Sequence, residues 1–178
     1  MHQSVLQFWF HEIKPAQWWK VDPEFDLLIA ERFGEIHRMA VRAELFEWRS
    51  DPSGRLAEVI VLDQFSRNIY RGDRRAFEAD PLALALAQAA VAAEADLALN
   101  QEERTFLYMP YMHSESKLIH EVAEQLFREH APKNNYEFEL RHKAIIDRFG
   151  RYPHRNEVLG RESTPDEIVF LAEPGSRF

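Results

Sequence analysis

Leu62-Asp63-Gln64-Phe65-Ser66-Arg67-Asn68-Ile69-Tyr70-Arg71-Gly72 places charged and amide side chains where a helix would be expected to be most apolar. An apolar stripe that begins at Leu56 runs into Asp63 and Arg67 on the same helical face. Residues 148–161 contain the same combination of residues, because an Arg-Asn pair is again followed by another Arg and a Gly. We predict that the two stretches meet in the folded chain and form one polar, arginine-rich site.

Helical spacing of apolar residues extends outward from this stretch over nearly the whole chain, and almost nothing has the alternation of a strand. Helices are expected near residues 5–10, 22–43, 55–71, 80–98, 100–109, 114–131, 136–149 and 164–171. Pro110 is expected to end one of them, and Gly34 to permit a close contact between helices. The sequence therefore predicts a single all-α domain over residues 1–178, built from antiparallel helical hairpins.

Composition excludes several classes of function. The 178 residues include no cysteine, so disulfides, thiolate zinc sites and a cysteine nucleophile are ruled out. The net charge of -8 argues against nucleic-acid partners and anionic membranes, which require a cationic surface. The first apolar run reaches Glu12 and Lys14 too early for a signal peptide or a spanning helix, so we expect a soluble cytoplasmic protein.

The charge is unevenly distributed along the chain. Residues 141–161 hold six arginines and lysines against two acids, and residues 63–75 hold four arginines against two acids. An acidic chain with two arginine-rich segments favours a small anionic ligand, a phosphate or a carboxylate, over a polymer.

On one ideal helix, Gln64, Arg67, Asn68 and Arg71 are spaced i, i+3, i+4 and i+7 and share a face. Two guanidinium groups and two amides suit a planar oxyanion, because arginine offers paired donors and amides can orient the ligand. The structural alternative is that Asp63 pairs with Arg67 at i+4. In that alternative, Arg71 caps a helix end or pairs with an acid from another helix.

His113, Ser114 and Glu115 lie at a predicted helix start, where free backbone N–H groups favour an anion. His113 is a candidate general acid or base, with Glu115 setting its tautomer. In the structural alternative, Ser114 caps the helix, Glu115 is a first-turn acid and His113 is a hydrogen-bonded structural residue.

Gly150 and Pro153 predict a turn that places four polar side chains on an ordered loop: Arg151, His154, Arg155 and Asn156. The alternative is that the arginines hold the loop by bonding helix C-terminal carbonyl groups. No pair of histidines has the spacing of a known zinc motif, and no glycine-rich phosphate loop or serine elbow occurs. We therefore expect neither a metal nor a cofactor.

Three motifs carry a resemblance to a known family: Leu62 to Phe65 with Arg67-Asn68 and Tyr70 to Gly72; Phe106 to Tyr108 with Pro110 and His113 to Glu115; and Phe149 to Arg151 with Pro153 to Asn156. Together with the aromatic N-terminus they resemble the uncharacterised bacterial family called domain of unknown function 924, over nearly the whole chain. The resemblance implies an all-helical fold similar to tetratricopeptide-repeat proteins and no established activity. The chain departs from the family pattern at Ser66, where proline is usual, and at Tyr152, where phenylalanine is usual.

The leading hypothesis is a pocket for a small anionic ligand, with acid-base or hydrolytic chemistry. In this hypothesis four arginines hold the ligand: Arg67, Arg71, Arg151 and Arg155. Three amides orient it: Gln64, Asn68 and Asn156. His113 or His154 transfers the proton. The rival hypothesis is a protein-interaction scaffold, in which helical hairpins form a groove for a partner peptide and the motifs hold the scaffold together.

Overall fold

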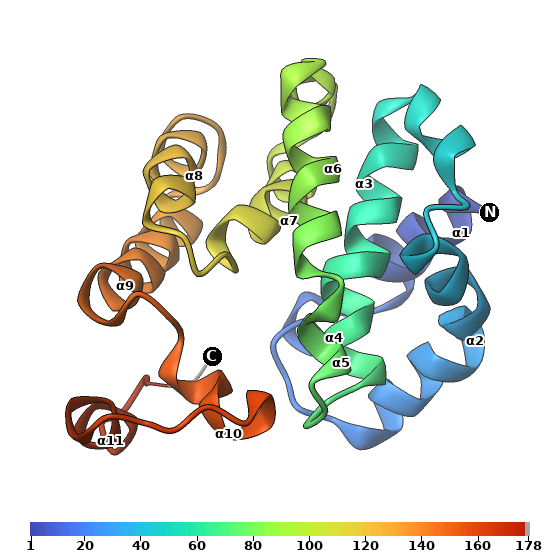
Figure 1. Cartoon of the computed structure of the whole chain (residues 1–178). Coiled ribbons are helices and arrows are strands. Elements are labelled where there is room, and N and C mark those ends of the chain that lie inside the picture. Colours follow the sequence, from blue (N-terminus) through green and yellow to red (C-terminus); the bar gives the residue numbers. More distant parts are fainter. Residues whose placement is uncertain (177–178) are drawn as a thin grey trace.

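The computed structural model describes residues 1–176 as helices joined by short turns, and none of these residues belongs to a strand (Figure 1). The α-helices are α1 (His2–Gln7), α2 (Pro23–Val41), α3 (Pro52–Ile60), α4 (Ser66–Ile69), α5 (Arg75–Glu78), α6 (Asp80–Ala92), α7 (Gln101–Met112), α8 (Lys117–His130), α9 (Lys133–Phe149), α10 (Asn156–Leu159) and α11 (Pro165–Leu171). The predicted all-α class is confirmed, whereas the likeness to tetratricopeptide repeats stays a prediction.

Shorter turns connect these helices. Two are π-helical, η1 (Phe8–Glu12) and η4 (Val61–Phe65), and four are 3₁₀ turns, η2 (Pro15–Gln17), η3 (Phe46–Ser50), η5 (Ala95–Ala98) and η6 (Pro153–Arg155), within the part of the chain that the structure describes. The turn η4 overlaps the start of the Leu62 to Gly72 stretch. A π turn fits an extra residue into a helix and changes the direction of the side chains that follow it.

Capping side chains set several helix starts. Asp22 accepts hydrogen bonds from the N–H groups of Glu24 and Phe25, as its place before Pro23 predicts. Reciprocal capping boxes begin α7 at Asn100 and α11 at Thr164. The expected start of α3 near Arg55 was late, because Asp51 bonds the N–H of Gly54 and the helix begins at Pro52.

Two sequence-based expectations about proline and glycine were wrong. Helix α7 continues past Pro110 to Met112, because every residue from 105 to 112 is buried and packing holds the helix together. A Cβ atom on Gly34 would meet nothing within 4 Å, so that glycine makes no close contact. The close approach is at Gly54, where a Cβ atom would lie 2.0 Å from the carbonyl oxygen of Trp48.

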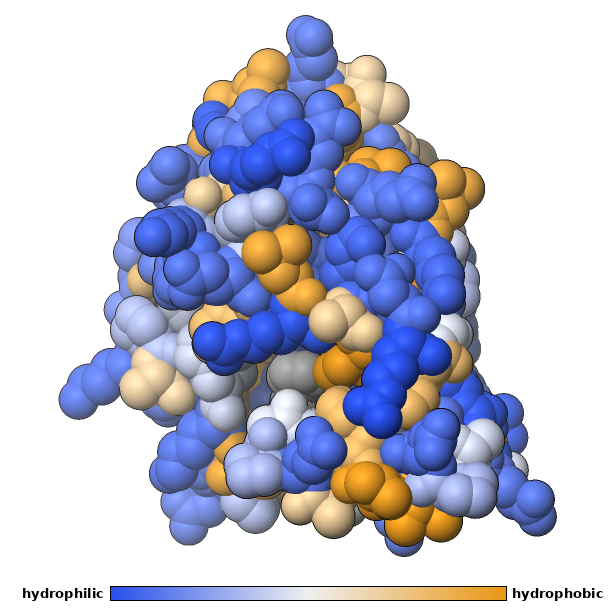
Figure 2. Space-filling model, turned by 90° about the vertical axis from the view of Figure 1, so that its left-hand side faces the viewer, coloured by the Kyte–Doolittle hydropathy of each residue, from blue (hydrophilic) through white to orange (hydrophobic). Residues whose placement is uncertain are grey.

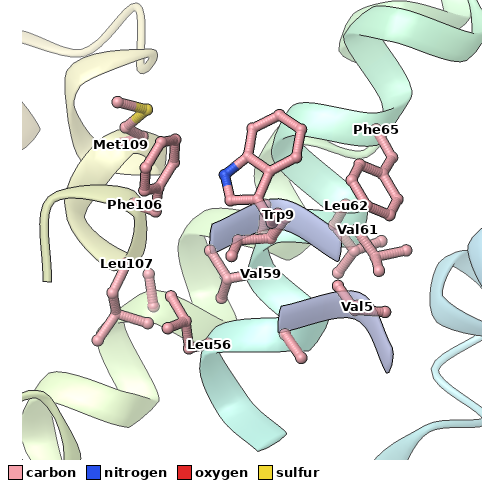
Figure 3. Packing of buried hydrophobic residues seen from close by; sticks show 14 of the residues in the cluster. Val5, Trp9, Leu56, Val59, Val61, Leu62, Phe65, Phe106, Leu107 and Met109 are labelled. Atoms are coloured by element: carbon pink, nitrogen blue, oxygen red, sulfur yellow. The ribbon is translucent and has the colours of Figure 1, made fainter. Parts of the chain in front are cut away.

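The hydrophobic core centres on Trp9, which is fully buried. Its ring lies between Phe65 and Phe106, with ring centroids 5.5 and 5.6 Å away (Figure 3). Leu56 and Val59 of α3 complete the same layer. The motif residue Phe65 therefore helps to anchor η4 in the centre of the molecule.

The C-terminal part has a smaller apolar interior of its own. It consists of Ile145, Ile146 and Tyr152, with Phe149 and Phe170 packed beside them. In Figure 1 this part forms the lower left of the molecule, where α10 lies across from α5. Polar contacts, described below, join it to the rest of the chain.

Helices α8 and α9 bury a polar pair between them. His120 and Glu139 are fully buried and bond each other at 2.7 Å, whereas Leu118, Val122 and Leu140 are exposed. Figure 2 shows this side of the molecule as a largely hydrophilic surface interrupted by separate hydrophobic residues. No helix within residues 1–176 is both long and apolar enough to cross a bilayer.

Candidate functional site

A cavity of about 340 Å³ lies between α5, the start of α6, the end of α7, and η6 with α10. Three of the candidate site residues line it: His113, Glu115 and Arg155. Phe77 and Asp80 also line it. The cavity therefore brings together the His113 motif and the second arginine-rich stretch.

His113 is held by Asp63, not by Glu115 as predicted. Its Nδ1 lies 2.8 Å from Oδ1 of Asp63, a fully buried carboxylate at the start of the motif. Because a carboxylate only accepts hydrogen bonds, Nδ1 carries the proton and donates it. The other ring nitrogen, Nε2, then keeps its lone pair, and the structure gives it no hydrogen-bond partner in residues 1–176. The side chain is 17% exposed, on the cavity wall.

Electrostatics favour a carboxylate beside a neutral imidazole. Burial would raise the pKa of Asp63, but the charge of Arg67 and the bonds from His113 and Gln64 outweigh it and hold that pKa well below its usual range. Burial, reinforced by the charge of Arg67, lowers the pKa of His113. His113 is therefore an unprotonated base at neutral pH, with Asp63 placed to stabilise the cation that forms when it takes a proton.

Helix α7 ends at Met112, with His113 as its C-cap, whereas the sequence suggested that a helix starts there. Three consecutive carbonyl groups at this end receive donors from α8 and from the C-terminal part of the chain. Tyr152 Oη donates to Met112 O at 2.5 Å, Arg155 Nη2 to His113 O at 3.0 Å, and His120 Nε2 to Ser114 O at 2.8 Å. Helix C-terminal carbonyls have no partner within the helix, so these side chains satisfy them and fix the backbone of His113.

Asp80 joins the two arginine-rich stretches. Arg67 binds both of its carboxylate oxygens, at 2.9 and 3.0 Å, and Arg155 reaches one of them at 3.3 Å. Arg67 also lies 3.2 Å from Asp63, which is the predicted i, i+4 pair. The two stretches meet at Arg67 and Arg155, as predicted.

Arg155 is less well compensated than Arg67. It is buried between the rings of Phe77 and Tyr152, with its guanidinium carbon 4.6 and 4.7 Å from their centroids. Its Nε is buried without a hydrogen-bond partner within residues 1–176. Burial and the charge of Arg67 lower the pKa of Arg155, whereas Asp63 and Asp80 outweigh burial at Arg67 and raise its pKa.

Gln64, Asn68 and Arg71 do not face the cavity. Gln64 Nε2 donates to Oδ2 of Asp63 at 2.6 Å and thus supports the carboxylate. Asn68 and Arg71 both bind Asp26 of α2, with Arg71 Nε 2.5 Å from Oδ2 and Asn68 Nδ2 2.8 Å from Oδ1. The predicted shared face fails because α4 ends at Ile69, so Arg71 lies beyond the helix.

Arg151, Asn156 and His154 hold the C-terminal loop together. Arg151 binds both oxygens of Glu167 in α11, at 2.7 and 2.8 Å, and Asn156 reaches the same carboxylate at 3.3 Å. His154 packs against Tyr152, with ring centroids 5.6 Å apart, and is not among the residues that line the cavity. The structure therefore separates these three from the predicted pocket.

Several residues at the site escaped the sequence analysis. Arg161 binds both oxygens of Glu115, at 2.6 and 3.0 Å, and the N–H of Tyr152 donates to the same carboxylate at 2.8 Å. The position of Asp80 before Pro81 predicts the start of a helix, but it does not predict that Asp80 binds two arginines. No pattern in the sequence marks the buried pair of His120 with Glu139. Within the described residues, no group of three or more histidines and acids is arranged to hold a metal ion.

The buried histidines predict a fall in stability in mild acid. Burial lowers the pKa of His142 to about 3 and that of His154 to about 4. Below the ordinary histidine pKa of about 6.5 the unfolded chain takes up protons that the folded chain does not, so stability decreases as pH falls. We expect the free energy of unfolding to drop by on the order of 1–2 kcal/mol per buried histidine between pH 7 and pH 5. Urea unfolding at the two pH values measures this drop.

The matched variant for this prediction is His142→Gln. It should reduce the difference in unfolding free energy between pH 7 and pH 5, because one titrating group is lost. An unchanged pH dependence in the variant would contradict the assignment to His142.

Comparisons with known proteins agree with the fold. The family model for a bacterial protein of unknown function, DUF924, matches residues 5–175, which confirms the resemblance. Among solved structures, a protein of unknown function from Agrobacterium tumefaciens superposes with a TM-score of 0.91, at 34% sequence identity and 96% coverage of each chain. A comparison with curated proteins gives no match. Neither description names a ligand or a reaction.

Proposed function

Since the chain belongs to the bacterial DUF924 family, which brings no known activity with it, we propose a function from the cavity: binding of a small anionic substrate at Arg155 and acid-base or hydrolytic chemistry at His113. Arg155 holds the anionic group of the substrate. His113 takes a proton from the substrate or from a water molecule. Asp63 orients the imidazole ring and stabilises the imidazolium that results.

The observation that carries this proposal is the contrast between the two arginines on Asp80. Arg67 uses both terminal nitrogens on that carboxylate, whereas Arg155 makes one longer contact of 3.3 Å. A guanidinium group has five N–H donors, and the two bonds of Arg155, to Asp80 and to the carbonyl of His113, leave three of them unused. A buried cation with unused donors on a cavity wall is suited to an anion.

The geometry of His113 supports the base. The Asp63 bond fixes the tautomer with Nδ1 protonated, so Nε2 accepts the proton. In a hydrolysis, Nε2 takes one proton from water while the oxygen attacks the substrate, and the same proton then passes to the leaving group. In a proton transfer, it takes the proton from carbon or oxygen directly and then returns it to another atom of the substrate or to solvent. In both cases Nε2 ends without the proton that it took up.

The charge around the cavity predicts that binding takes up a proton. Three arginines face three acids in this network, so it is neutral while His113 is neutral; its members are Arg67, Arg155, Arg161, Asp63, Asp80 and Glu115. A bound anion favours the protonated form of His113 and raises its lowered pKa back towards the ordinary range, where the ring can both take and give a proton. Affinity for the anion should therefore rise as pH falls towards the ordinary histidine pKa of about 6.5.

The test is isothermal titration of the full chain with a panel of small carboxylates and inorganic phosphate. A ligand that binds at Arg155 and His113 should give a heat that depends on the ionisation enthalpy of the buffer, which reports proton uptake. Arg155→Lys should weaken binding by about tenfold or more, since a lysine offers no paired donors for an oxyanion. His113→Gln should abolish the buffer dependence.

The matched control is Arg151→Lys. This arginine lies on the same loop and binds a carboxylate through two bonds, but it does not line the cavity. It should leave ligand affinity unchanged. Equal affinities for the parent and the Arg155→Lys variant would overturn the proposal and would favour the rival function, a helical scaffold for a protein partner.

A further inference from the structure

We propose that the ligand of this cavity is a monocarboxylate with an extended apolar body, of the class of short fatty acids or their derivatives. This inference rests on the proposed function, because it takes Arg155 as the site of the anionic group. It goes further by specifying one negative charge, a carboxylate in preference to a phosphate, and a hydrocarbon portion beside it.

The apolar part follows from the lining of the cavity. Phe77 comes from α5, and Pro81 and Leu84 come from the start of α6. Pro81 and Leu84 are three residues apart in one helix, so they lie on the same side of it. Pro110 of α7 and Leu159 of α10 contribute from other directions. Hydrocarbon side chains on the walls favour a ligand that carries hydrocarbon itself.

The single charge follows from the way the acids on the wall are paired. Asp80 is bound by Arg67, and Glu115 is bound by Arg161 through two hydrogen bonds, so neither arginine remains for a ligand. Among the described lining residues, Arg155 is the buried cation, and three of its donors are unused. A second anionic group on the ligand would lie near the carboxylates of Asp80 and Glu115, with no free buried cation to bind it. Binding of such a ligand would be unfavourable, because like charges in a partly buried site repel strongly.

The exposed end of the cavity does not supply that cation. Arg74 lines it, but 71% of its side chain is exposed and it lies 3.5 Å from Glu78. An exposed pair of this kind contributes little to binding, since solvent screens it. Polyphosphates and dicarboxylates are therefore poor ligands for this cavity.

The carboxylate follows from the remaining donors of Arg155. Each terminal nitrogen of the guanidinium carries two N–H groups and uses one, on Asp80 or on the carbonyl of His113. One N–H on each nitrogen is left, which matches the two oxygens of a carboxylate. A phosphate would bring a further oxygen and a further charge. The described lining residues offer them the hydroxyl of Ser114 and the exposed guanidinium of Arg74, but no second buried cation.

The volume fits a small ligand. At about 340 Å³ the cavity is near the lower end of the range of about 300–1,000 Å³ that is usual for small-molecule sites. Burial of each additional CH₂ group is worth about fourfold in affinity until the cavity is full. The gain from butyrate to hexanoate should therefore be roughly 15-fold.

The experiment titrates the full chain with butyrate, hexanoate, 1-hexanol and inorganic phosphate, and measures the dissociation constants by isothermal titration or by chemical shifts in NMR. Hexanoate should bind roughly 15-fold more tightly than butyrate. It should also bind more tightly than phosphate, and at least tenfold more tightly than 1-hexanol, which has the same body without the charge. The Leu159→Gln substitution should weaken the binding of hexanoate more than it weakens the binding of butyrate. The control, Leu97→Gln, changes a leucine that is exposed and lies outside the cavity.

The outcomes separate this inference from the proposed function. If butyrate, hexanoate and phosphate bind with similar affinity and Arg155→Lys weakens all three, the anion site stands and the fatty-acid inference is wrong. If 1-hexanol binds as well as hexanoate, the cavity is an apolar site and both the proposed function and this inference are wrong. If hexanoate binds equally well to the parent and to the Leu159→Gln variant, the apolar body of the ligand does not occupy this cavity, and the inference is also overturned.

Discussion

Replacement of Asp63 by alanine is expected to lower the free energy of unfolding by about 3–5 kcal/mol, the usual cost of removing one partner from a buried ionic network. The carboxylate is fully buried and lies 3.2 Å from Arg67 and 2.8 Å from His113. Without it, Arg67 loses one of the two charges that oppose its burial, and His113 loses the acceptor of its Nδ1–H. Urea unfolding at pH 7 measures the loss.

Asp73→Ala is the matched control for Asp63→Ala. Asp73 also binds an arginine through two bonds, Arg75 at 3.0 and 2.9 Å, and accepts the backbone N–H of Arg75 at 2.9 Å, but both of these side chains are exposed. Solvent screens such a pair, so the control should lose about 1 kcal/mol or less. Equal effects of the two substitutions would show that the Asp63 network does not stabilise the fold.

Gly54→Ala is expected to destabilise the protein by about 3 kcal/mol, at the upper end of the usual cost of overpacking. The new Cβ would lie 2.0 Å from the carbonyl oxygen of Trp48. Because that neighbour is backbone, relief requires movement of η3 or of α3, whose first turn Asp51 holds in place. The same substitution at Gly34, in the middle of α2, should stabilise the protein by about 0.5–1 kcal/mol, since alanine is the better helix former.

Thermal unfolding of the two glycine variants, checked by urea titration, measures this difference in sign. A stabilised Gly54→Ala protein would mean that α3 and η3 are not as closely packed as the distance to Trp48 indicates. A destabilised Gly34→Ala protein would mean that the Gly34 side of α2 has a neighbour.

Sequence patterns were sufficient for the features that depend on local chemistry. Capping residues such as Asp22, Asn100 and Thr164 mark helix starts because they bond N–H groups two or three residues away. The i, i+4 pair of Asp63 with Arg67 is likewise local. Charge density along the chain also identified the two stretches that meet at Asp80, although it could not identify Asp80 itself.

The remaining features of the site depend on contacts between residues far apart in the chain. The partner of His113 lies fifty positions earlier, at Asp63, whereas Glu115 was the local candidate. The shared face of Gln64 and Arg71 assumed one continuous α-helix, but a π turn precedes α4 and the helix ends at Ile69. Helical periodicity could not place His120 in the interior, because its burial depends on a partner from another helix.

Ser66 and Tyr152, where the resemblance led us to expect proline and phenylalanine, each place a hydroxyl group inside the protein, and each hydroxyl has a partner. Ser66 Oγ donates to Leu62 O at 2.6 Å and lies 2.8 Å from Nε2 of His37. Tyr152 Oη donates to the carbonyl of Met112, next to His113. A phenylalanine at position 152 could fill the same space but could not make that bond.

The small apolar interior of the C-terminal part has a consequence for how the cavity exchanges with solvent. Units with few buried apolar contacts open by local unfolding at a lower free energy than the global transition. Ile145, Ile146 and Tyr152 form such a small interior, and Arg155 and Leu159 belong to the same part of the chain. We expect a sub-global opening of this part to remove one wall of the cavity while the helices around Trp9 stay folded. Ligand entry would then depend on the local unfolding of the C-terminal part. A bound ligand would slow amide hydrogen exchange throughout that part.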